Sequence, residues 1–94
     1  MSDLNRIQLP QPTNVPGGVS VYEYLIEVEV GPKDKNAFTT MEMVVPVAMT
    51  QQKPGEVQNY IADKLAEYFL QQPQFGGNRM EINKTIIKDF WWVK

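Results

Sequence analysis

Acidic side chains are the groups in this sequence that could most directly take part in chemistry. Glu23, Glu27 and Glu29 have the same parity in a β-branched and aromatic stretch, so they would share one face of a strand. Carboxylates on one face could hold a hard cation, but no second ligand group of the D-x-D-x-D type accompanies them. Asp63 and Glu67 lie four apart on the polar side of a predicted helix, where a solvated surface is the simpler interpretation. We therefore expect no metal and no cofactor.

Most enzyme classes lack their characteristic residues in this sequence. It contains no histidine and no cysteine, so an imidazole base, a Ser-His or Cys-His arrangement and a cysteine-based zinc site are all excluded. The only serines are Ser2 and Ser20, in or beside the N-terminal region. The phosphate-binding patterns G-x-x-x-x-G-K-[ST] and G-x-G-x-x-G do not occur. We expect a protein that is not an enzyme and has no small-molecule substrate.

The most unusual stretch is KDFWWVK, which places three aromatic rings close to the C-terminus of the sequence. Chain ends are usually polar and loosely held, so these rings need a surface to pack against. Successive residues of a strand point to opposite faces, which puts Phe90 and Trp92 on one face and Trp91 and Val93 on the other. One helix can cover only one face of a small sheet, so at least one tryptophan should lie on the uncovered face.

Four segments carry a regular pattern that positions these residues. Residues 19–30 and 37–49 alternate as half-buried strands, and the turn-forming residues 31–36 connect them. Residues 54–72 have helical periodicity, with Val57, Ile61, Leu65, Tyr68 and Phe69 on one stripe and Pro54 in the first turn. Residues 85–93 resume a strand pattern, with 80–83 as its start or as a separate piece.

These segments predict an α+β fold of order β-β-α-β, with a three-stranded, mainly antiparallel sheet and one helix packed on one face. Pro46 cannot donate to a ladder, which favours an edge position for the second strand, at least over its second half. A right-handed crossover sets the last strand parallel to the second, so the expected sheet order is 2-1-3. Residues 1–18 are rich in proline and glycine and predict a flexible N-terminal arm. Residues 19–94 form the single domain.

Composition places the chain among soluble globular domains. It has 94 residues, of which 43% are hydrophobic and 21% charged, with a net charge of −2. No apolar run approaches the roughly 20 residues that cross a bilayer, and the N-terminus lacks the pattern of a signal peptide. We expect a cytoplasmic protein with no membrane partner.

The uncovered sheet face is the predicted functional surface. We expect it to bind protein, through self-association or a different partner, because Trp and Tyr are enriched in interface hot spots and free strand edges can pair. The predicted interface residues are Val21, Leu25, Val44, Ile87, Trp91 and Val93. Glu23, Glu27 and Glu29 would form a rim that tunes partner choice. If instead the N-terminal region or residues 80–84 fold back over this face, the protein would be a monomer without a hydrophobic patch.

Such a small acidic module would suit an accessory or inhibitory protein, including one encoded by a virus or phage. The alternative function is single-stranded nucleic-acid binding, which uses aromatic platforms flanked by cations. The candidate residues are Arg79, Lys84, Lys88, Phe90 and Trp92, in the basic C-terminal third. The negative net charge argues against this alternative.

Overall fold

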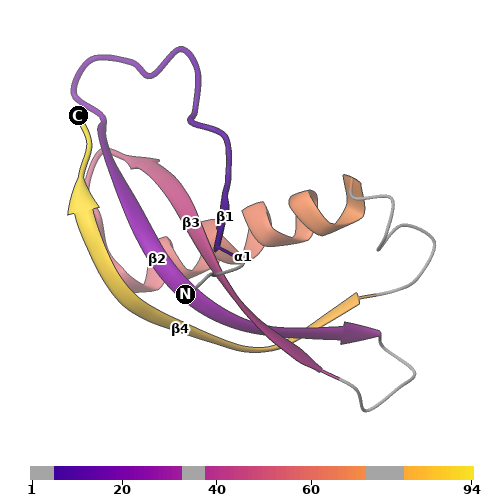
Figure 1. The fold of residues 1–94 in the computed structure, drawn as a ribbon. Coiled ribbons are helices and arrows are strands. Elements are labelled where there is room, and N and C mark those ends of the chain that lie inside the picture. Colours follow the sequence, from indigo (N-terminus) through magenta and orange to yellow (C-terminus); the bar gives the residue numbers. More distant parts are fainter. Residues whose placement is uncertain (1–5, 33–37, 72–79) are drawn as a thin grey trace.

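The computed structural model describes residues 6–32, 38–71 and 80–94, which form one helix and a four-stranded mixed sheet (Figure 1). The elements are β1 (Arg6–Gln8), β2 (Ser20–Pro32), β3 (Thr39–Met49), α1 (Pro54–Gln71) and β4 (Met80–Trp92). The strand order is β1-β3-β2-β4. The predicted α+β class is confirmed. The predicted count of three strands is wrong.

The β2–β3 hairpin forms because every second residue is apolar from Tyr22 to Val30 in β2 and from Met41 to Met49 in β3. Tyr24 pairs with Val45 and Ile26 with Met43, in antiparallel register. These side chains face the helix and are buried together with further apolar residues of the same parity. The core cluster consists of Leu9, Tyr24, Ile26, Val28, Val30, Met43, Val45, Val47, Val57, Ile61, Leu65 and Phe69.

Helix α1 closes this core from one side of the sheet. It starts at Pro54, as predicted, and buries the stripe Val57, Ile61, Leu65 and Phe69. The helix lies closest to β3, so the helix-facing side of β4 is covered less completely. No helix in the described part of the chain is both long and apolar enough to cross a membrane.

Strand β1 is the element that the sequence did not predict. Arg6 pairs with Glu42 and Gln8 with Val44, in parallel with β3, and the Leu9 amide donates to the Val44 carbonyl at 3.0 Å. Because Leu9 is only 4% exposed, the expectation of a flexible arm is wrong for this segment. Strand β3 is therefore an inner strand from Glu42 to Val44, where β1 pairs with it. The edge position predicted for the second half of the strand, around Pro46, is not contradicted, because β1 does not extend that far.

Strand β4 pairs antiparallel with β2 along its whole length, but not in a single register. Asp89 pairs with Leu25 and Ile87 with Ile26, so Lys88 is an extra residue between the two pairs. A bulge of this kind exchanges the faces of the side chains beyond it, here as far as a second register shift between Lys84 and Ile82. Lys84 therefore lies on the opposite face of the sheet from Phe90 and Trp92, although all three have even numbers.

Candidate functional site

Strand β4 forms one edge of the sheet. The opposite edge consists of β1, with 3 residues, and the part of β3 that β1 does not cover, whereas β4 has 13 residues. Each edge strand presents backbone N–H and C=O groups that no neighbouring strand of the sheet takes up. The length of β4 makes it the larger of the two edges for pairing with another chain.

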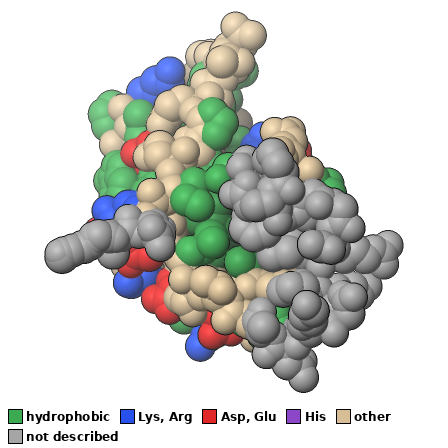
Figure 2. Space-filling view, turned by 45° about the vertical axis from the view of Figure 1, so that its right-hand side comes forward, with side chains coloured by type: hydrophobic (Ala, Val, Ile, Leu, Met, Phe, Trp, Pro, Cys, Tyr) green, Lys and Arg blue, Asp and Glu red, His purple; other side chains and the backbone are tan. Residues whose placement is uncertain are grey.

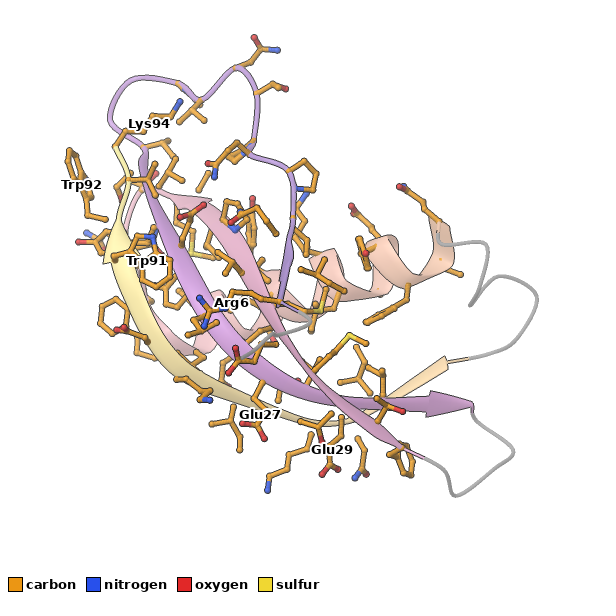
Figure 3. The ribbon with its side chains drawn as sticks, in the orientation of Figure 1. Arg6, Glu27, Glu29, Trp91, Trp92 and Lys94 are labelled. Atoms are coloured by element: carbon orange, nitrogen blue, oxygen red, sulfur yellow. The ribbon has the colours of Figure 1, made fainter. Side chains whose placement is uncertain are left out.

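Hydrophobic side chains are exposed mainly on this same strand. Among the described residues, the exposed large hydrophobic side chains on β4 are Ile86 (40%), Phe90 (57%), Trp91 (37%) and Trp92 (63%). The other exposed large hydrophobic side chains of the described residues are Phe38 and Leu70, which lie outside β4. Figure 3 shows Trp92 projecting away from the end of β4, whereas Trp91 lies over the strands. We call Phe90, Trp91 and Trp92 the aromatic edge.

On the helix side, the aromatic edge continues into a row of tyrosines. The Phe90 ring stacks on the Tyr24 ring at 5.5 Å between centroids, and its centroid lies 6.2 Å from that of Tyr22. The Tyr24 hydroxyl donates to Gln52 Oε1 at 2.8 Å, and burial, followed by the charge of Tyr22, raises the pKa of Tyr24. These rings and Val57 of α1 line a groove of about 380 Å³. Phe90 is therefore the residue of the aromatic edge that packs against rings of the same chain.

On the outer face, Trp91 is tied to the N-terminal segment through Glu23. Trp91 Nε1 donates to Glu23 Oε1 at 2.7 Å. The other carboxylate oxygen of Glu23 accepts from Gln8 Nε2 at 3.1 Å and from Gln11 Nε2 at 2.5 Å. The segment that follows β1 therefore lies over part of the face that was expected to be open.

A chain of ion pairs crosses the outer face beside these aromatic residues. Lys88 Nζ lies 2.9 Å from Glu42 Oε2 and 3.7 Å from Glu27 Oε1. On the other side of Glu42, Arg6 Nη2 lies 3.1 Å from Glu42 Oε1. Hydrogen bonds from Lys88 and then Arg6 lower the pKa of Glu42. The hydrogen bond to Glu42 raises the pKa of Lys88. Acidic and basic side chains are also interspersed on the side of the molecule that Figure 2 shows.

The structure brings together only part of the predicted protein interface. Trp91 is exposed on the outer face, where Leu25 and Val93 are half-buried. Val21 is 0% and Val44 4% exposed, so the prediction that they surround an accessible surface is wrong.

Ile87 lies on the helix side, packed against the core, so its predicted place beside Trp91 is also wrong. The bulge at Lys88 puts Ile86 on the outer face instead, opposite Glu27. The bulge could not be predicted from the sequence, because the adjacent isoleucines Ile86 and Ile87 fit either register.

The predicted rim residues all have partners within the chain. Glu23 accepts a hydrogen bond from Trp91, and Glu27 forms an ion pair with Lys88. Glu29 accepts a hydrogen bond from Asn83 Nδ2 at 2.9 Å. No group of three or more acidic side chains suited to a metal ion occurs among residues 6–32, 38–71 and 80–94.

The residues of the nucleic-acid alternative do not share a face. Lys84 pairs with Glu29 and Lys88 contacts Glu42, both on the outer face. Phe90 and Trp92 pair with tyrosines on the helix side. The predicted platform of alternating cations and rings is therefore wrong in geometry. Its remaining member, Arg79, lies outside the described residues.

Comparisons with protein-family models, with curated proteins and with solved structures find no significant match.

Proposed function

We propose that this protein is a non-enzymatic protein-binding module that pairs its β4 edge with an extended strand of a partner. Binding by strand addition takes affinity from backbone hydrogen bonds and specificity from side chains at alternate positions. The single observation that carries the proposal is the coincidence of the long edge strand with most of the exposed large hydrophobic side chains of the described chain.

The exposure of this edge favours a binding role over a purely structural one. Proteins that keep an edge strand in solvent usually protect it with charges, proline or a covering segment. Here the C-terminal half of β4 presents Phe90, Trp91 and Trp92, and aromatic residues of this kind often anchor interfaces. In this proposal the protein acts in the cytoplasm as an accessory or inhibitory protein.

Selection from a random peptide library tests the proposal. The wild-type protein is expected to enrich peptides with alternating β-branched or aromatic residues, and Trp92→Lys is expected to lose them because a charge then occupies the edge. Leu70→Lys is the matched control, since Leu70 is 82% exposed but lies on α1. Failure to enrich alternating peptides, or equal binding by Trp92→Lys, would contradict the proposal.

A further inference from the structure

The backbone of β4 has a defined set of groups that point away from the sheet. The Val93 amide donates to the Val21 carbonyl of β2 at 2.8 Å. Hydrogen-bonding direction alternates along an antiparallel strand, so the amides and carbonyls of Phe90 and Trp92 point outward. The Phe90 amide indeed donates at 2.8 Å to the carboxylate of its neighbour Asp89 rather than to β2.

We propose that a second copy of this chain is the partner, bound through antiparallel β4–β4 pairing about a two-fold axis at Trp91. This inference rests on the proposed strand-adding function and names its partner. In this register Phe90 lies opposite the partner subunit's Trp92. Both residues have outward backbone groups, so each of the two symmetry-related pairs exchanges both of its N–H···O bonds.

The side chains favour this register over its neighbours. Phe90 meets the partner subunit's Trp92 on the helix side, and Trp91 meets the partner subunit's Trp91 on the outer side, so every ring of the aromatic edge has an aromatic partner. Centring the axis on Phe90 would place Asp89 opposite Trp91. Centring it on Trp92 would place Phe90 opposite Lys94.

Asp89 marks each end of the paired segment, where it lies opposite the partner subunit's Val93 on the outer side. The carboxylate of Asp89 would release the Phe90 amide on pairing. That exchange makes Asp89 a temporary cap on the edge in the separated chain.

The pairing surface is small, so the dimer is expected to be weak. An aromatic side chain can bury about 150–250 Å², and the rings of the aromatic edge are 37–63% exposed. Pairing would remove roughly 600 Å² of aromatic surface from water, less than the roughly 1,200–2,000 Å² of total surface that a standard interface buries. We therefore expect a weak dimer that dissociates on dilution.

Solution mass as a function of concentration is the first test. Sedimentation equilibrium should show a monomer–dimer equilibrium for the wild type and for Leu70→Lys, and a monomer for Trp92→Lys. A wild-type monomer throughout the range would overturn self-pairing. If such a monomer still enriched alternating peptides, the strand-adding function would stand and its partner would be a different chain; if it enriched none, both proposals would fail.

Engineered cysteines test the register, since the chain has no cysteine of its own. Residues directly opposite in a non-hydrogen-bonded pair have Cα atoms about 4.5 Å apart, within the range that a disulfide spans. Trp91→Cys should therefore form a disulfide-linked dimer on mild oxidation, many-fold faster than Phe90→Cys. Faster cross-linking of Phe90→Cys would overturn the proposed axis.

Discussion

Trp91 and Trp92 are neighbours in the sequence but have different surroundings in the structure. Trp91 donates a hydrogen bond to Glu23 on the outer face, whereas Trp92 projects from the end of β4 on the helix side and is 63% exposed. The alternation of the strand predicted that the two rings diverge. It did not predict that Trp92 would remain largely accessible, because that depends on α1 lying nearest to β3.

Glu42 gives the outer face a pH-dependent contribution to stability. Its pKa in the folded protein is lowered from the usual 4.5, so the folded state favours the charged form. The resulting stabilisation is present above the unfolded-state pKa and is lost as the pH falls through the folded-state pKa. Glu42→Gln should therefore lose less stability than the wild type on acidification from pH 6 to about pH 3. Urea denaturation at several pH values measures the free energy of unfolding of both proteins. The same dependence on pH in the variant and the wild type would contradict this expectation.

Phe69 and Leu70 offer a matched pair of adjacent residues on α1. Phe69 is 4% exposed in the core, and Leu70 is 82% exposed. We expect Phe69→Ala to lower the free energy of unfolding by about 3–5 kcal/mol, and Leu70→Ala to change it by no more than about 0.5 kcal/mol. Thermal or urea unfolding gives both values. Similar losses for the two variants would mean that the buried stripe is assigned incorrectly.

At the scale of elements, β1 determines whether the N-terminal segment belongs to the fold. Ile7 packs against the core cluster, and Leu9 is part of it. We expect Leu9→Ala to cost about 2–5 kcal/mol of stability, as for other buried leucines. Denaturant titration measures this cost. Thr13→Ala, an exposed change in the same segment, is the control, and a Leu9→Ala variant as stable as this control would show that β1 adds little.

The elements also show where sequence patterns are sufficient. The β2–β3 hairpin and α1 were predicted closely because Ile26, Met43 and Ile61 each belong to long, regular apolar patterns. β1 was missed because three residues are too few to establish a period. The faces of Ile86 and Ile87 were exchanged because one extra residue, Lys88, shifts the register, and a bulge has no signature in a single apolar pair.

At the scale of the whole molecule, charge bears on the choice between a protein and a nucleic-acid partner. The net charge is −2, and Lys88, a predicted nucleic-acid contact, already lies between Glu27 and Glu42. We expect no retention on single-stranded DNA at low salt, because phosphate binding needs available cations. A column assay tests this. Salt-dependent retention that is lost in the double variant Lys84→Glu/Lys88→Glu would instead restore the nucleic-acid reading.

The pairing of β2 with β4 also has a consequence for how the chain folds. The β2–β3 hairpin is local and can form within about 1–10 µs. The pairing of Tyr22 with Trp92 joins residues that are far apart in the sequence, with β3 and α1 between them. Contacts this distant slow folding. Until they form, the backbone of β2 lacks its neighbour on that side and is open to pairing between chains. Strand β4, which we propose as the binding edge of the folded protein, therefore also protects β2 of its own chain from pairing with other chains during folding.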